Sequence, residues 1–258
     1  MPAEYLDPSV KLHFNKYFAS PIELVGAAGV TIRLCEFESL LLQDCRDCKI
    51  ELCFARPISS TRNPLQINRC QNISVSFFCS RVLQGPTEIE DIVSVCESDR
   101  VTIEDSWLEG NRPDLPERLA SGSAGMVDYK CSRVVFQRCY GVDVHNCGFG
   151  ISDGVDNAIR GCCVYSEKGG GEGDVGIYVG QAEEYRRAGN IFKGNAAEDN
   201  LVYWTMRGGM RNDWWLDGAA VAARNKSLPA SAASGCVRKW WKIWTKRRDE
   251  AVRRMPPV

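Results

Sequence analysis

Apolar and polar residues alternate in short segments that recur along most of the chain. In one copy, Cys131 is followed by Val134, Phe136 and Cys139, three, five and eight residues later. An apolar residue at every second position indicates a β-strand with one buried face. Equivalent segments begin at six anchor residues, and a weaker seventh copy is expected from Arg187 to Asn195. The anchors are Ala27, Cys45, Cys70, Ser98, Cys131 and Asp156.

Turn-forming residues such as Asp44, Asn63-Pro64 and Gly110-Asn111 separate the copies. Strands that return after each turn can stack in parallel, roughly 4.8 Å apart. No single copy can bury its apolar face alone, so each must stack on its neighbours. The repeat therefore predicts a solenoid.

The chain has 13 cysteines, an odd number. A chain of 258 residues does not need disulfides to fold, and a thiol is a small apolar filler for a core. Cys45 and Cys48 are spaced like one half of a zinc site, but the further ligands of such a site are missing. We therefore expect no metal there. We expect two ladders of stacked inward thiols. One contains Cys35, Cys53, Cys79, Cys139 and Cys162, and the other contains Cys45, Cys70 and Cys131.

These repeats resemble those of the right-handed parallel β-helix family, which includes pectate lyases and polygalacturonases. Two further segments carry the resemblance, Asp174–Gly180 and Asn190–Asn195. It implies an all-β, single-stranded solenoid of about six to eight coils with a C-terminal helical extension. We expect an N-terminal capping segment over 1–21, the β-helix over 22–205, and an irregular segment, linker and helix over 206–258.

Charge is unevenly distributed along the chain. The net charge is −1, which gives no general attraction to nucleic acid. From Arg238 onward the chain has eight Lys or Arg but only two acidic residues, Asp249 and Glu250. Apolar residues form a stripe among them. Such a basic amphipathic helix over 236–258 either packs back on the solenoid or binds a membrane surface or a protein partner.

Two features bear on location. The N-terminus has no signal-peptide pattern and no apolar run is long enough to span a membrane. Free thiols would favour a reducing compartment such as the cytoplasm. The exported relatives of the resembled family point the other way, so the location stays open.

Candidate chemistry gathers between residues 130 and 180. Asp143 and His145 alternate with Val142 and Val144, which predicts that both point outward from one strand. An inserted loop from Gly110 to Gly125 precedes them and is expected to shape a groove. The catalytic candidates are His145, Asp143, Asp153 and Asp156, and the substrate-binding candidates are Arg133, Arg138, Arg160 and Asp174.

The resemblance implies an enzyme that acts on acidic polysaccharide. Ser152–Asp156 partly matches the aspartate motif of polygalacturonases, in which paired carboxylates act as acid and base. The second aspartate pair and the other motifs of that family are missing. A lyase would instead need a base for the C5 proton and a cation for the uronate carboxylate, and Ca²⁺ is the one cofactor left open. The alternative is a non-catalytic scaffold, in which these aspartates only satisfy turn backbone.

Overall fold

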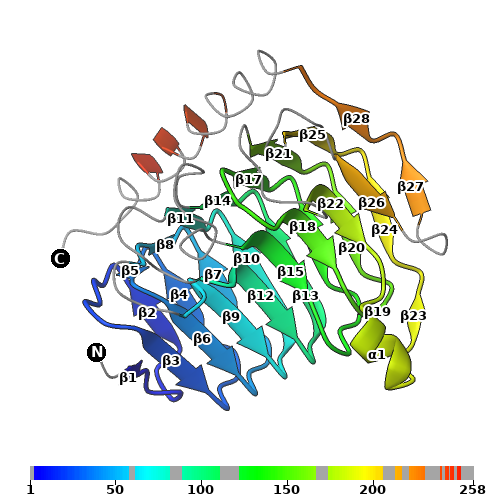
Figure 1. Cartoon of the computed structure of the whole chain (residues 1–258). Helices are drawn as coiled ribbons and strands as arrows, with labels where there is room; N and C mark the ends of the chain where they lie inside the picture. The colour runs from blue at the N-terminus through cyan, green and yellow to red at the C-terminus, as the bar shows by residue number, and fades with distance from the viewer. Residues whose placement is uncertain are drawn as a thin grey trace.

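The computed structural model describes residues 3–57, 62–81, 89–110, 122–166, 174–205, 213–216 and 221–229, together with 239, 242–243, 245–246 and 249–250. Its strands form three long parallel sheets, which we call A, B and C, and the chain visits them in turn (Figure 1). Each circuit after the first adds one strand to each sheet. The predicted all-β parallel solenoid is confirmed.

Sheet A has the strand order β1 (Glu4–Tyr5), β3 (Ile22–Val25), β6 (Leu40–Gln43), β9 (Leu65–Asn68), β12 (Asp91–Cys96), β15 (Ser123–Val127), β18 (Cys147–Ile151), β22 (Val175–Val179) and β26 (Trp214–Leu216). Sheet B has the order β2 (Leu12–Phe14), β4 (Thr31–Arg33), β7 (Lys49–Glu51), β10 (Gln71–Ser76), β13 (Asp99–Glu104), β16 (Val135–Gln137), β20 (Ala158–Arg160), β24 (Ala196–Glu198) and β27 (Val221–Ala223). Sheet C has the order β28 (Lys226–Ser227), β25 (Leu201–Trp204), β21 (Cys163–Ser166), β17 (Tyr140–Val142), β14 (Trp107–Glu109), β11 (Cys79–Arg81), β8 (Phe54–Ala55) and β5 (Glu36–Phe37).

Two smaller elements interrupt the circuits. Strands β19 (Gly154–Val155) and β23 (Phe192–Lys193) pair with each other, and the short helix α1 (Glu183–Arg187) lies between β22 and β23 in the sequence. The strands of the three sheets also extend beyond residues 22–205 at both ends, since β1 and β2 precede Ile22 and β26 to β28 follow residue 205. The described residues between 239 and 250 are helical.

The apolar repeat sets the register of sheet B. Ile32, Ile50, Val75, Ile103 and Phe136 lie in register and are buried. The predicted sixth copy began two residues too late along the chain. It aligned Ile159 with Val134, whereas Ile159 pairs with Phe136. The seventh copy was also misplaced, since residues 183–187 form α1 and Ala197 continues the row.

Small inward side chains line the corners between sheets. Cys45, Cys70 and Cys131 are buried as predicted, with Ser98 at the intervening level. The predicted inward position of Cys79 in the first ladder was wrong, because Cys79 pairs with Phe54 and Trp107 on the outer side of sheet C. Phe78 takes the inward place instead. All described cysteines are free thiols: Cys35, Cys45, Cys48, Cys53, Cys70, Cys79, Cys96, Cys131, Cys139, Cys147, Cys162 and Cys163.

Asparagine replaces cysteine at these corners in the last coils. Asn200 Oδ1 accepts a hydrogen bond from the backbone N–H of Cys162 at 2.8 Å, and its Nδ2 donates to the Ile159 carbonyl at 3.0 Å. Asn157 similarly accepts from the N–H of Val134 at 2.9 Å. The amides therefore satisfy backbone groups that a thiol satisfies less well.

The corner from sheet B to sheet C has two residues, and the first of them has left-handed backbone. In every coil this residue has a positive φ, although only one of them is glycine. Such conformations are costly for ordinary side chains, so the stacked neighbours must hold them in place. The residues are Asn15, Leu34, Leu52, Phe77, Asp105, Arg138, Gly161, Asp199 and Arg224.

The connections from sheet C to sheet A vary most in length. Two are short, from Phe37 to Leu40 and from Val142 to Cys147. The others include residues 58–61, 82–88, 111–121, 167–173 and 206–212, which lie outside the described part of the chain. The predicted loop from Gly110 to Gly125 falls mostly there, but its end was wrong because β15 begins at Ser123.

No helix in the described part of the chain is both long and apolar enough to cross a membrane. The predicted basic amphipathic helix over 236–258 lies largely outside the described residues, apart from the helical positions 239, 242–243, 245–246 and 249–250.

Candidate functional site

The C-to-A corner, where the chain passes from sheet C to sheet A, holds His145. The residue lies on the short connection between β17 and β18, not on a strand as its alternation with Val144 had predicted. Val144 is buried and anchors the connection, whereas Asp143 takes a positive φ of 49° and lies on the same connection. The backbone N–H of His145 donates to the Gly122 carbonyl at 3.0 Å, which ties this turn to the coil before it.

His145 faces a carboxylate from the next coil. Its Nδ1 lies 3.6 Å from Oδ2 of Asp174, the residue before β22, and both side chains are mostly buried. This separation is within ion-pair reach but too long for a direct hydrogen bond. The other ring nitrogen, Nε2, is shielded from solvent and has no hydrogen-bond partner among the described residues. A buried polar atom of this kind calls for a physical explanation.

A second carboxylate, Asp91, opens β12 at the same corner. The side chain is 5% exposed, and its Oδ1 accepts a hydrogen bond from the backbone N–H of Ser123 at 3.3 Å. Burial raises the pKa of Asp91 to about 7, and the negative charge of Asp128 contributes to the shift. A carboxyl group with this pKa can hold or release a proton near neutrality.

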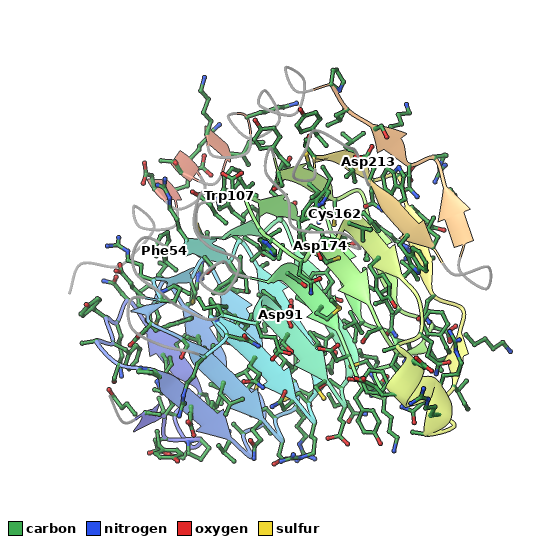
Figure 2. All side chains as sticks on the ribbon, viewed as in Figure 1. Phe54, Asp91, Trp107, Cys162, Asp174 and Asp213 are labelled. Carbon is green, nitrogen blue, oxygen red and sulfur yellow. The ribbon has the colours of Figure 1, made fainter. Side chains whose placement is uncertain are left out.

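The thiol of Cys147 lies near both of these carboxylates. Burial raises the pKa of Cys147, and the charges of Asp91 and Asp174 raise it further. Both carboxylates therefore lie near this thiol. Figure 2 shows Asp91, Asp174 and Asp213 following one another along the stack, in line with their places before or at the start of β12, β22 and β26.

Asp213 lies at the same corner, and its carboxylate accepts hydrogen bonds from neighbouring strands. Its Oδ1 accepts a hydrogen bond from the backbone N–H of Trp204 at 3.1 Å, and its Oδ2 accepts one from the hydroxyl of Ser227. The carboxylate joins three strands of the last coils.

A further acidic position lies at the opposite end of sheet A. Asp128 follows β15, and its Oδ1 accepts a hydrogen bond from Ser152 Oγ at 2.8 Å. Burial raises the pKa of Asp128 to about 6, with further contributions from Glu90 and Glu184. The ring of Tyr185 in α1 packs at a tilt of 45° against that of Tyr129, with ring centroids 5.4 Å apart, so α1 packs beside this carboxylate.

The predicted residues Asp153 and Asp156 lie on the connection between sheets A and B. Asp153 is fully buried, and its carboxylate accepts hydrogen bonds from the N–H of Lys130 at 2.9 Å, from Asn190 Nδ2 at 2.7 Å and from Gln181 Nε2 at 3.2 Å. Asp156 is exposed and has a positive φ of 57°. The structure does not bring either residue to the C-to-A corner.

The predicted substrate-binding arginines lie around sheet B and pair with carboxylates of adjacent coils. Arg133 Nη2 is 2.5 Å from Asp99, and Arg160 Nε is 3.0 Å from Glu198. Arg138 contacts both Glu104 and Asp105, at 2.6 and 2.8 Å. These half-exposed pairs contribute little to stability.

The structure thus gathers three of the eight candidates, His145, Asp143 and Asp174, on the C-to-A connections. It adds Asp91, which the sequence analysis missed. The sequence signal that could have identified Asp91 is an acidic residue directly before the apolar run of β12, where the strand enters the core.

Comparisons with known proteins show similarity of fold. No family model and no curated protein matches the sequence. A crystal structure of the periplasmic alginate epimerase AlgG, in a double-mutant form, has a TM-score of 0.60 and 8% sequence identity over 84% of this chain and 50% of that chain. A second AlgG structure has a TM-score of 0.56 and 8% identity over 88% of this chain and 51% of that chain.

The chain therefore spans about half the length of the structures it matches. At this level of identity the similarity concerns the fold alone. Together with the three parallel sheets, it identifies the chain as a right-handed parallel β-helix.

Proposed function

We propose that the chain acts on a polysaccharide of acidic sugars, as a lyase-type enzyme that removes the proton beside a uronate carboxylate. The observation that supports this most directly is His145, with Nδ1 near Asp174 and Nε2 without a partner among the described residues. An imidazole held beside a carboxylate is a suitable general base.

In this proposal each group at the corner has a distinct role. Binding of the polymer exposes His145 Nε2, which accepts the C5 proton, and Asp174 stabilises the imidazolium that forms. The electron pair of the C5–H bond forms the C4–C5 double bond as the C4–O4 bond breaks, and the leaving oxygen takes its proton from the imidazolium. Asp91, with a pKa of about 7, supplies a proton or a hydrogen bond to the uronate carboxylate. Such a hydrogen bond offsets the charge that develops when the proton leaves. The structural similarity to an alginate epimerase is compatible with this substrate class.

Ca²⁺ has no role in the proposed steps. Among the described residues no three His, Cys, Asp or Glu side chains are gathered closely enough to hold a metal ion.

The test is incubation of the protein with alginate, pectate and related uronates. Ultraviolet absorbance would report an unsaturated lyase product, and new reducing ends would report glycosidase-like hydrolysis. We expect His145→Ala to lower kcat by about 10²- to 10⁴-fold, because a positioned general base contributes that much. Lys49→Ala, on the exposed outer side of sheet B, serves as the matched control.

A non-catalytic binding scaffold is the second candidate. It is favoured by the arginines, which pair with neighbouring carboxylates, and by the distance in the fold between Asp153, Asp156 and the C-to-A corner. If no uronate is converted and His145→Ala binds these polymers as the wild type does, the enzyme proposal fails and the scaffold is supported.

A further inference from the structure

An apolar strip runs along the outer side of sheet A in its last coils. Met126 pairs in register with Gly150, Gly150 with Tyr178, and Tyr178 with Trp215. We call these four residues the outer strip. The equivalent positions in earlier coils are mostly polar, with Glu23, Leu41, Gln66 and Ser94.

The side chains of the strip form a continuous surface. A Cβ on Gly150 would lie 2.6 Å from Met126 Sδ, so the methionine covers this glycine. Tyr178 and Trp215 come next along the axis, and Trp215 is 58% exposed. A large exposed apolar ring in a row of packed neighbours is a common feature of binding surfaces.

The polar ends of the two aromatic residues converge over Gly180. A Cβ at Gly180 would lie 3.2 Å from Trp215 Nε1 and 3.2 Å from Tyr178 Oη. Both rings therefore place their hydrogen-bonding atoms at one point of the outer side of sheet A, over Gly180. Amphipathic rings of this kind suit a ligand with an apolar face and a polar rim.

We propose that Tyr178 and Trp215 are a stacking platform for a pyranose ring of the polysaccharide. The C–H face of a pyranose is apolar and its hydroxyl groups lie around the rim, which matches the arrangement of rings and polar atoms. The proposal rests on the proposed function for the identity of the polymer, but it concerns binding and not the reaction.

The platform lies on the same strand as the reactive corner. Tyr178 belongs to β22, and Asp174 immediately precedes that strand. Four residues of extended chain span roughly 13 Å, a length that a short oligosaccharide covers. A sugar on Tyr178 and Trp215 could thus extend across sheet A toward His145 and Asp174.

Binding to the intact chain tests the proposal. Oligoalginate, oligogalacturonate and a neutral cello-oligosaccharide are titrated into the protein, and heat or electrophoretic retardation is measured. We expect Trp215→Ala to weaken binding of at least one probe about tenfold, which corresponds to about 1.4 kcal/mol, because the variant loses the contact with the aromatic ring. Trp215→Phe, which keeps the ring and loses Nε1–H, should bind with intermediate affinity.

Two further variants sharpen the result. Gly180→Ala should also weaken binding, because the new methyl group displaces the polar ends of both rings. Tyr17→Ala, which removes a ring that is 70% exposed at the first coil of the stack, should bind as the wild type does.

The contradicting outcomes are distinct. The proposal is overturned if the wild type binds none of the probes, if Trp215→Ala binds unchanged, or if Tyr17→Ala loses as much affinity. It is also overturned if the wild type is a dimer that Trp215→Ala converts to a monomer without sugar, because a second copy then occupies the strip. Binding without turnover would leave this inference intact and refute the enzyme proposal alone.

Discussion

Asp91 shows how position in the solenoid sets the chemistry of a single residue. A carboxyl group at a strand start is normally ionised at neutral pH, but here burial and a like charge favour the protonated form. Its folded-state pKa of about 7 lies above the ordinary value of 3.8. The folded chain therefore binds more protons than the unfolded chain between these two values.

This shift predicts a specific dependence of stability on pH. The contribution of Asp91 is fully present below pH 3.8 and is lost as the pH rises through about 7, up to about 4 kcal/mol in all. Asp91→Asn should unfold at higher denaturant concentration than the wild type at pH 8, with a smaller difference at pH 4. Urea unfolding at both values measures the effect.

The matched control for that experiment is Asp156→Asn, at an exposed corner. It should follow the wild-type profile. An Asp91→Asn profile parallel to that of the wild type would show that Asp91 is ionised in the folded chain, and its assigned role as proton donor would then fail.

His145 marks what local sequence could and could not predict about the site. Its rarity singled it out, and the structure places it beside Asp174, which was also predicted. The alternation of Val142, Asp143 and Val144 resembled a strand, yet β17 ends at Val142 and a turn follows. Asp91 was missed because its pKa depends on burial by residues distant in the sequence, which no local pattern records.

At the scale of the strand and its corner, inward polar residues are as informative as the apolar repeat. Val134, Phe136 and their equivalents predicted the strands of sheet B well, because period-two patterns are local. Register errors arose in the sixth and seventh copies, where Asn157, Asn195 and Asn200 replace cysteine and α1 is inserted. Most hydrogen bonds of these amides are between coils, so spacing alone did not reveal them.

The amide at Asn200 is expected to matter more than a typical polar side chain. Asn200→Ala leaves the N–H of Cys162 and the carbonyl of Ile159 without their partners in a buried corner. We expect a loss of about 2–4 kcal/mol in the free energy of unfolding, since each buried unsatisfied group costs about 1–3 kcal/mol.

Chemical denaturation followed by circular dichroism checks this value. Asn146→Ala, at an exposed position, is the control and should change stability by less than about 0.5 kcal/mol. Equal stabilities of the two variants would mean that water or a backbone shift satisfies the corner.

At the scale of the whole molecule, stacking makes the interior continuous from the first coil to the last. Thiols fill much of this interior, and every described cysteine is free. Only Cys96 among them is partly accessible, while the others are buried. The folded chain should therefore conceal thiols that its unfolded form exposes.

Thiol titration measures this directly. Under denaturing conditions without reductant, close to all 13 cysteines should react. In the native state the buried thiols should react many times more slowly than Cys96, because opening of the solenoid must come first. Recovery of far fewer thiols from the denatured chain would indicate disulfides and contradict the free-thiol core.

The unequal corners of the solenoid have a consequence for protein engineering. The corner between sheets B and C is held to two residues, the first of them left-handed, in each coil, so a length change there would shift the register of every later strand. The C-to-A corner already accommodates connections of very different length without disturbing the sheets. A foreign peptide grafted between Val142 and Cys147, or in place of residues 111–121, would be displayed beside the reactive corner on a frame that keeps its own register.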